Sequence, residues 1–301
     1  MALPTTTGTT FAGKNAGFYI SAALKQANSL NFLTLMENVK YKAVIQKLES
    51  GAEMQNSSCD FTDAGTLALT EAIIAPKDLQ VNLEICSKNL IDSWEALEMR
   101  AGAGAPAPAS FDDYLVSHLA GRIAQGVENA TWSGNDATAG SFTGFTTATV
   151  GVLVTDGTVV DVAKTAAFTA ANIIDNLQAA TAAIPTNIYT AEDLYIYMSP
   201  KSYRLYISAM STLNYINMSQ MNDSYQPFFE GIKIAVCNGF ENDKLVAAEK
   251  SNLFFGTDLI SDSTNIQLLD QSHTGSLNTR LIARFTGGVQ VGIGADVVFV
   301  S

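Results

Sequence analysis

A regular pattern of apolar positions in the middle of the chain predicts one long helix. Its apolar side chains recur every fourth residue over five turns, at Phe111, Leu115, Leu119, Ile123 and Val127. A second face carries small side chains, at Ser117, Gly121 and Ala124, so another element could approach it closely. The helix should begin at Ser110, a good N-cap followed by two aspartates, and end near Thr131. Residues 101–109 hold two glycines and two prolines, which cannot continue a helix.

Before this helix the apolar period shortens to two, which indicates β-structure. Strict alternation is seen at Leu79, Val81, Leu83 and Ile85, and two further strands are expected at residues 43–48 and Leu67–Ile74. We expect the strands at 67–74 and 79–85, which Pro76–Lys77–Asp78 separates, to form a ribbon, and the polar residues 51–66 between the first two strands to form a loop or a hairpin tip. Such a ribbon is too small to fold alone, so a neighbouring molecule would have to cover one face. An ordinary edge hairpin is the alternative.

After the long helix, short strands and helices alternate. Strands are expected at residues 150–154, 159–162, 194–198, 231–236, 244–248 and 253–259. Helices are expected at residues 170–184, ended by Pro185, and after Ser199, which can cap a helix that begins with Pro200. Two long strands, at residues 277–286 and 289–300, should close the chain.

The N-terminal segment differs from the rest in pattern and charge. Residues 1–12 have the composition of an unstructured arm, and residues 17–28 predict a short helix that is apolar nearly all round. That helix must be covered, either by its own core or by a neighbour. Residues 1–48 contain five lysines and one glutamate, a net charge of +4. A basic arm would suit a segment that faces DNA, although five lysines on a solvated segment are an equal alternative.

The composition of the whole chain favours self-association. Charged residues make up 15% of the 301 residues, against about 25% in ordinary soluble domains. An obligate oligomer explains this low charge, and a monomer with a surface rich in Thr, Ser and Asn is the alternative. The net charge of −12 argues against tight general nucleic-acid binding. No signal peptide and no apolar run of 18 residues is present, so neither secretion nor a membrane partner is expected.

No active site can be recognised in the sequence. Cys59, Cys86 and Cys237 lack CxxC spacing and have only His118 and His273 as further soft ligands, so no zinc site is predicted. The three thiols should be reduced. Neither histidine lies in a nucleophile motif, and His118 is better explained as a core or interface residue. We therefore predict no catalytic residue, no cofactor and no metal, hence a protein that is not an enzyme.

Several local patterns resemble the major capsid protein of tailed double-stranded DNA phages, the Hong Kong 97-type fold. The aromatic and glycine-rich turn after that family's spine helix is matched by Trp132, Gly134, Asn135, Gly144 and Phe145. Residues 59–96 resemble the extended-loop region of capsid proteins from phages of Bacteroidetes hosts, including crAss-like phages. The strand that runs into Met198–Ser199–Pro200 and a helix resembles the family's axial domain.

The resemblance covers most of residues 14–301 and implies an α+β subunit. By this resemblance residues 1–48 would be the N-terminal arm and 49–95 the extended loop, a β-hairpin. The peripheral domain, with the long spine helix, would comprise residues 96–165 and 262–292. The axial domain would comprise residues 166–261 and 293–301. The chain departs from the family pattern because it shows no extra N-terminal scaffolding segment and no large insertion domain.

The resemblance also implies the function of a capsid protein. Pentamers and hexamers of the chain would tile an icosahedral shell around double-stranded DNA, so the protein would assemble in the host cytoplasm and reside in the virion. Expected partners are neighbouring capsomers, packaged DNA by weak non-specific contact, and portal, scaffold and decoration proteins. Inter-subunit contacts are expected at Phe18, Leu24, Leu67, Leu69, Leu83 and Ile85. Charges at Leu83 and Ile85 should then abolish assembly and spare the fold. An encapsulin-like shell, a tail tube and a surface-layer polymer are the alternatives.

Overall fold

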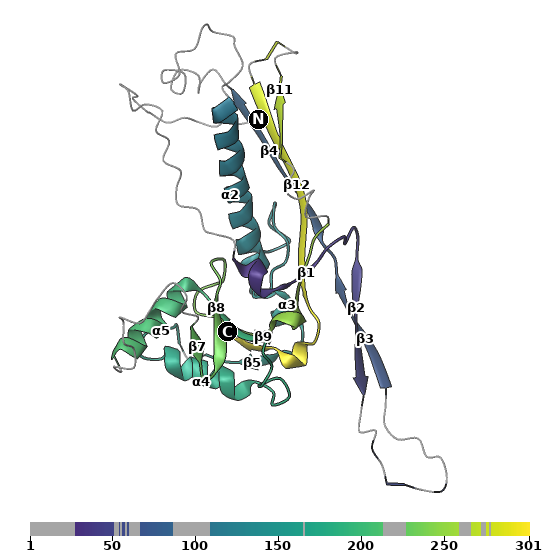
Figure 1. Ribbon diagram of the computed structural model, residues 1–301, viewed down its shortest axis with the longest axis vertical. Coiled ribbons are helices and arrows are strands. Elements are labelled where there is room, and N and C mark those ends of the chain that lie inside the picture. The colour runs from purple at the N-terminus through teal and green to yellow at the C-terminus, as the bar shows by residue number, and fades with distance from the viewer. Residues whose placement is uncertain are drawn as a thin grey trace.

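The computed structural model describes residues 28–50, 54, 56–57, 59, 67–86, 109–164, 166–212, 227–258, 266–271, 275–276 and 278–301. These residues form three parts (Figure 1). One part consists of a long helix lying along long strands, the second is a rounded body of strands and helices, and the third is a two-stranded ribbon that projects away from both. All but the last residue of the expected helix at residues 17–28, including Phe18 and Leu24, lies outside the described residues.

The long helix, α2, spans Ala109–Ser133, so the predicted helix is confirmed and runs slightly further at each end. It lies against a sheet whose longest strand is β12, Asn278–Val291. Leu119 and Ile123 of α2 line a common groove with Leu79 and Phe285 of the sheet. The apolar ridge read from the sequence therefore faces β-structure of the same chain.

Five strands make up the sheet beneath α2. They are β1 (Thr34–Met36), β4 (Lys77–Cys86), β10 (Leu253–Gly256), β11 (Ile266–Asp270) and β12. β12 pairs antiparallel with β4, β10 and β11, and β1 joins the sheet parallel to β10. The expected break between residues 286 and 289 is wrong, because β12 passes through Gly287 and Gly288 without a turn. A Cβ at either glycine would lie 2.9 Å from an atom of a neighbouring segment, so a larger residue would not fit there.

The ribbon consists of β2 (Ala43–Ser50) and β3 (Leu67–Ile74), paired antiparallel from Ala43 opposite Ile74 to Ser50 opposite Leu67. The expected pairing of the strands at 67–74 and 79–85 is therefore wrong. β4 pairs instead with β12 over its whole length, so Leu83 and Ile85 lie in the sheet beneath α2. Alternation reveals that one face of a strand is buried, but it does not reveal which element buries it.

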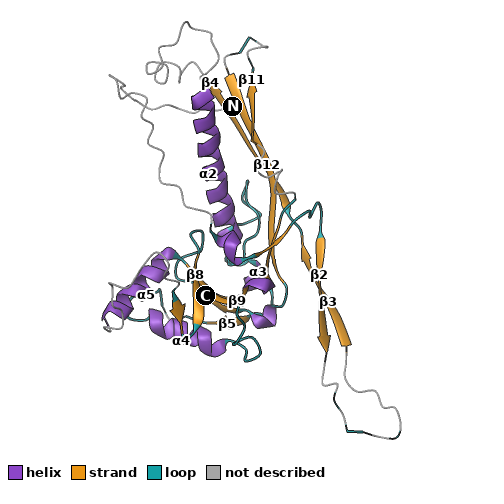
Figure 2. Cartoon of the chain, in the orientation of Figure 1, coloured by secondary structure: helices purple, strands orange, loops and turns teal. Residues whose placement is uncertain are grey.

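The rounded body is built on a six-stranded mixed sheet of order β5–β13–β9–β6–β8–β7. Its strands are β5 (Val160–Val162), β6 (Leu194–Met198), β7 (Phe228–Phe229), β8 (Ile232–Val236), β9 (Leu245–Glu249) and β13 (Val298–Val300). Two helices, α4 (Ile173–Ala183) and α5 (Pro200–Thr212), pack on it (Figure 2). The Ser202 N–H donates to Ser199 Oγ at 3.1 Å, which confirms Ser199 as the cap of α5.

One expected strand of this region is a helix. Residues Val152–Thr155 form the short helix α3, where the Val154 and Thr155 N–H groups donate to the carbonyl of Gly151 at 3.0 and 2.9 Å. The β-branched residues Val152, Val154 and Thr155 favour a strand locally, but packing decides the conformation here, because Leu153 points inward and is 2% exposed.

Both faces of the six-stranded sheet are buried. Along β6, Leu194, Ile196 and Met198 enter a core with α4 and α5, while Tyr195 and Tyr197 enter a second core with Trp132 and Phe145. A strand buried on both faces has a continuous apolar sequence, as Leu194–Met198 does. The second core also contains residues of the long-strand sheet, such as Leu253 and Val289, and so joins the two parts.

Three short 3₁₀ helices complete the described elements: η1 (Ser29–Phe32), η3 (Lys250–Asn252) and η5 (Gly294–Asp296). Of the cysteines, Cys59 is exposed, Cys86 half-buried and Cys237 buried, and all three are free. Within the described ranges no group of His, Cys, Asp and Glu could hold a metal ion. None of the described helices has the length and hydropathy needed to cross a bilayer.

Candidate assembly surfaces

The ribbon has one strongly apolar exposed face. Directly paired residues share a face, and the pairs Val44–Ile73, Leu48–Leu69 and Ser50–Leu67 fall on the same one. On this face Leu67, Leu69 and Leu48 are 70%, 60% and 63% exposed, and Val44 and Ile73 are each 48% exposed. The described part of the chain thus leaves five large apolar side chains of one narrow surface in water, which is typical of a surface that binds a partner.

A polar pair interrupts this apolar face. Gln46 and Glu71 lie opposite each other between the two apolar groups. The other face of the ribbon has smaller side chains at its far end, with Lys47 opposite Thr70 and Glu49 opposite Ala68, and it is partly covered at its base, where Ile45 and Ala72 are half-buried and Ile74 is buried. The face that holds Leu67 and Leu69 is therefore the more exposed of the two, and it is the face on which the ribbon can still bury apolar area.

The sequence-predicted contact residues fall into three groups. Leu67 and Leu69 lie on the exposed ribbon face. Leu83 is 45% exposed and Ile85 half-buried, but both are on the side of β4 that carries Leu79, which packs beneath α2. The chain itself covers part of this face of β4, and contact with a neighbouring copy at Leu83 and Ile85, as at Leu67 and Leu69, stays a prediction. Phe18 and Leu24 are outside the described residues.

The aromatic and glycine-rich turn after α2 forms a packed junction. The Trp132 ring is wholly buried and lies 5.3, 5.5 and 4.5 Å from the ring centres of Phe145, Tyr197 and Phe240. A Cβ on Gly144 would come within 2.6 Å of the Trp132 carbonyl oxygen. The residues that carry the family resemblance therefore join α2 to the rounded body. Their role in the subunit is structural.

A buried carboxylate that sequence reasoning missed lies at the same junction. Glu128 is 1% exposed, and its carboxylate accepts hydrogen bonds from Ser29 N at 3.1 Å, Ser29 Oγ at 2.5 Å and Gly239 N at 3.0 Å. The Trp132 Nε1–H also donates to Ser29 Oγ, at 2.7 Å. Three donors thus satisfy a buried charge and join η1, α2 and the turn after β8. Glu128 continues the small-residue face of the helix, and Gly239 packs closely against its backbone.

The thiol of Cys237, close to Glu128, is buried and therefore a poor nucleophile. Burial raises the pKa of Cys237 to about 12, and the nearby Glu128 carboxylate contributes in the same direction. Cys237 is thus a core residue with no thiolate at neutral pH.

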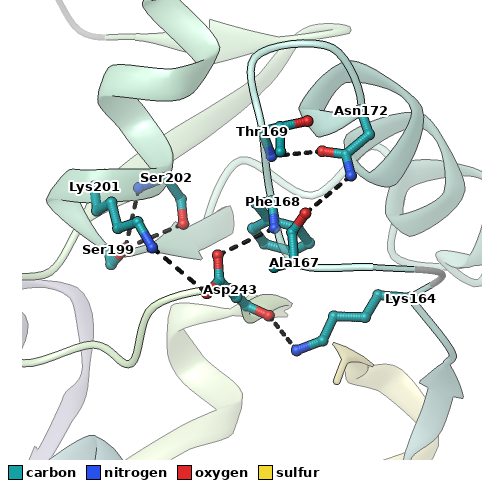
Figure 3. Close-up of polar contacts among 9 residues, drawn as sticks. All are labelled: Lys164, Ala167, Phe168, Thr169, Asn172, Ser199, Lys201, Ser202 and Asp243. Atoms are coloured by element: carbon teal, nitrogen blue, oxygen red, sulfur yellow. Dashed lines mark hydrogen bonds and ion pairs between the residues drawn. The ribbon is translucent and has the colours of Figure 1, made fainter.

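Asp243 ties three segments of the rounded body together (Figure 3). Its backbone carbonyl accepts from Lys164 Nζ at 2.6 Å, its Oδ1 accepts from Phe168 N at 3.1 Å, and its Oδ2 lies 3.6 Å from Lys201 Nζ. Asn172 closes the adjoining loop by accepting from Thr169 N and donating to the Ala167 carbonyl. Lys164 and Lys201 are therefore used within the subunit.

Comparison with solved structures identifies the architecture. The chain is similar to the capsid of an empty GTA particle, with 15% identity, coverage of 93% of this chain and 91% of that chain, and a TM-score of 0.60. It is similar to the capsid of Myoviridae phage XM1, with 11% identity, 97% and 99% coverage and a TM-score of 0.60. It is also similar to the capsid of cyanophage P-SCSP1u, with 14% identity, 98% and 92% coverage and a TM-score of 0.58.

The chain has the Hong Kong 97-type capsid fold. That α2 is the spine helix and the ribbon the extended loop of this fold stays a prediction. No protein-family model matches the sequence. No curated protein matches it either. A host among the Bacteroidetes stays a prediction.

Proposed function

We propose that this protein is the major capsid protein of a tailed phage and that its copies tile a closed icosahedral shell around double-stranded DNA. One observation carries the proposal: the fold likeness spans at least nine-tenths of both chains in each comparison. Little of the chain is left for a further domain with another activity. The protein would act structurally, without catalysis, and would reside in the virion.

The exposed ribbon face supports a shell rather than a monomer. A two-stranded ribbon with no further strand is marginal in water, and its apolar face is open in the subunit. A neighbouring copy that covers Leu67 and Leu69 would give each subunit apolar contact that it cannot make alone. Contact between copies in pentamers and hexamers is the arrangement that supplies such a neighbour at every position of a shell.

The strand pairing suggests a revised division of the subunit. In this proposal the extended loop is β2, β3 and their connection, and β4 belongs to the peripheral part with α2, β1, β10, β11 and β12. The axial part is the six-stranded sheet with α4 and α5. The basic N-terminal segment would face packaged DNA and bind it weakly without sequence preference. Portal, scaffold and decoration proteins and assembly in the host cytoplasm stay predictions.

Direct imaging tests the proposal. The full-length protein, purified and examined by light scattering and negative-stain electron microscopy, should form pentamers, hexamers or closed particles. A single species of 32.0 kDa across protein concentration and salt would refute it. Open tubes or planar lattices would refute the closed shell and favour a tail tube or a surface layer.

A further inference from the structure

We infer that two paired glycines, Gly256 and Gly288, form a notch that fixes the direction in which the β2–β3 ribbon leaves the subunit, and that this notch positions the ribbon for assembly. The part that concerns assembly rests on the function proposed above. The part that concerns direction rests on the geometry of the subunit alone.

The notch is a space that only glycine leaves open. Gly256 of β10 and Gly288 of β12 are directly opposite each other, so side chains at these positions would project from the same face. A Cβ at Gly256 would lie 2.6 Å from Ile74 Cδ1. A Cβ at Gly288 would lie 2.9 Å from Pro76 Cα and 3.2 Å from the Ala75 carbonyl oxygen. The end of β3 and the link to β4 therefore occupy the volume that two side chains would take.

The ribbon is held mainly at this end. Ile74, the last residue of β3, is 0% exposed, whereas Leu67 at the other end of the strand is 70% exposed. In Figure 1 the ribbon leaves the sheet near β1 and β12 and runs away from the rest of the described chain. A segment that is fixed at its base behaves as a lever, so a small shift at the notch becomes a larger shift at the far end.

Gly287 shows that β12 is closely packed on its other face as well. A Cβ at Gly287 would point to the opposite side of β12 and meet Phe142 Cε1 at 2.9 Å. The two consecutive glycines therefore admit the ribbon base on one face and an aromatic ring of the core on the other. This explains why Gly287 and Gly288 lie within a continuous strand.

The size of the lever effect follows from strand geometry. Gly288→Ala requires the backbone at Pro76 to move by about 0.5 Å to reach ordinary contact, which begins at 3.4 Å. Ile74 and Pro76 are about 7 Å apart along the chain, and an eight-residue strand is about 27 Å long. A shift of about 0.5 Å over about 7 Å tilts the ribbon by roughly 4° and moves its far end by about 2 Å.

Distance measurements between two spin labels test the direction of the ribbon without requiring assembly. One label would be placed at Ala68→Cys near the far end of the ribbon and one at Thr190→Cys on the rounded body, both exposed positions, with Cys59 and Cys86 replaced by serine. The labelled full-length protein is diluted into unlabelled protein so that only distances within one subunit are seen. With the glycines intact we expect one narrow distance distribution. A broad distribution would overturn the inference.

Three variants and a control separate the notch from a general loss of stability. Gly288→Ala should shift the distance by up to about 1.5 Å at this label, about 20 Å from the ribbon base, because the obstructing atoms are backbone. Gly256→Ala should shift it less, because the atom that the new Cβ meets at 2.6 Å is the movable end of the Ile74 side chain, and the added Ile74→Val should largely reverse the shift, because valine lacks Cδ1 and keeps only the Cγ1 at 3.1 Å. Gly157→Ala, where a Cβ meets nothing within 4 Å, should leave it unchanged. If Gly288→Ala does not fold, the Gly256 pair decides the question.

The outcomes distinguish this inference from the proposed function. Variants that melt at lower temperature with unshifted distances would show that the glycines serve stability only and would overturn it. Particles of Gly256→Ala should be absent or of abnormal size by negative stain, and normal after the added Ile74→Val. Normal particles despite a shifted distance would refute the role in assembly. If the unsubstituted protein forms no particles, the proposed function fails. The label distances then still test whether the two glycines fix the direction of the ribbon.

Discussion

Two glutamates on the apolar ribbon face should prevent assembly and leave the subunit folded. The double variant Leu67→Glu/Leu69→Glu places charge at the two exposed leucines of β3. Full burial of a leucine is worth about 1.5 to 3 kcal/mol, and these side chains are 70% and 60% exposed in the subunit. Folding should therefore lose only about 0.5 to 1 kcal/mol per site.

The loss at the contact between copies should be larger. The exposed part of each leucine is worth about 1 to 2 kcal/mol on burial, so the pair would cost each ribbon contact about 2 to 4 kcal/mol. Since 1.4 kcal/mol is a factor of ten, the contact should weaken by roughly 30-fold to several hundred-fold. Any burial of the new carboxylates without a partner adds to this.

The matched control uses the same strand and the same added charge. Ala68→Glu/Thr70→Glu adds the same two charges on the opposite face of β3, where Ala68 pairs with Glu49 and Thr70 pairs with Lys47 in the strand register. Light scattering and negative stain should show particles for the control and none for the leucine variant, with native circular dichroism for both. If the two variants assemble equally, or both fail to assemble, the apolar face is not the contact surface.

Three further predictions concern the subunit itself. Glu128→Gln should lower the free energy of unfolding by about 1 to 3 kcal/mol, because the NH₂ group of the glutamine would face an N–H donor. The control Glu192→Gln, at an exposed position, should leave the urea melt unchanged. An unchanged urea melt for Glu128→Gln as well would contradict the prediction. At pH 8 a thiol reagent should label the exposed Cys59 rapidly and Cys237 only after unfolding, since burial raises the pKa of Cys237 to about 12 and leaves it protonated below that pH; without reductant, fewer than three thiols in denaturant would show that some are oxidised. Leu83→Lys/Ile85→Glu should now destabilise the subunit, by roughly 1 to 3 kcal/mol, because β4 belongs to the sheet beneath α2; an unaltered thermal melt would restore the original expectation.

Periodicity predicted the elements of this fold better than their partners. The four-residue period identified α2, and the two-residue period and apolar runs identified β2, β3 and β6 nearly to the residue. The partner of β4 could not be predicted, because an alternating strand is equally compatible with a neighbour's surface and with the chain's own helix. The sequence of Val152–Thr155 misled in another way, since packing of Leu153 outweighs the local preference of β-branched residues.

The candidate site was accessible from the sequence only in part. Leu67 and Leu69 were predicted as contact residues because they alternate on a strand of a ribbon that is too small to bury one face by itself. Glu128 was missed because a charged residue on a helix is usually solvated. The available signal was its place at the end of a run of small residues, Ser117, Gly121 and Ala124, where close approach was expected. Gly256 and Gly288 are 32 positions apart in the sequence, and only the register of β10 and β12 brings them together.

The six-stranded sheet has a consequence for how the subunit unfolds. Its strands give alternate side chains to two cores, so Leu194 and Tyr195 are neighbours in the chain but belong to different cores. Melting either core would expose the other face of the same strands, and Trp132 extends this dependence to α2. The two parts of the subunit should therefore lose their structure in one cooperative transition, with a calorimetric enthalpy equal to the van't Hoff enthalpy.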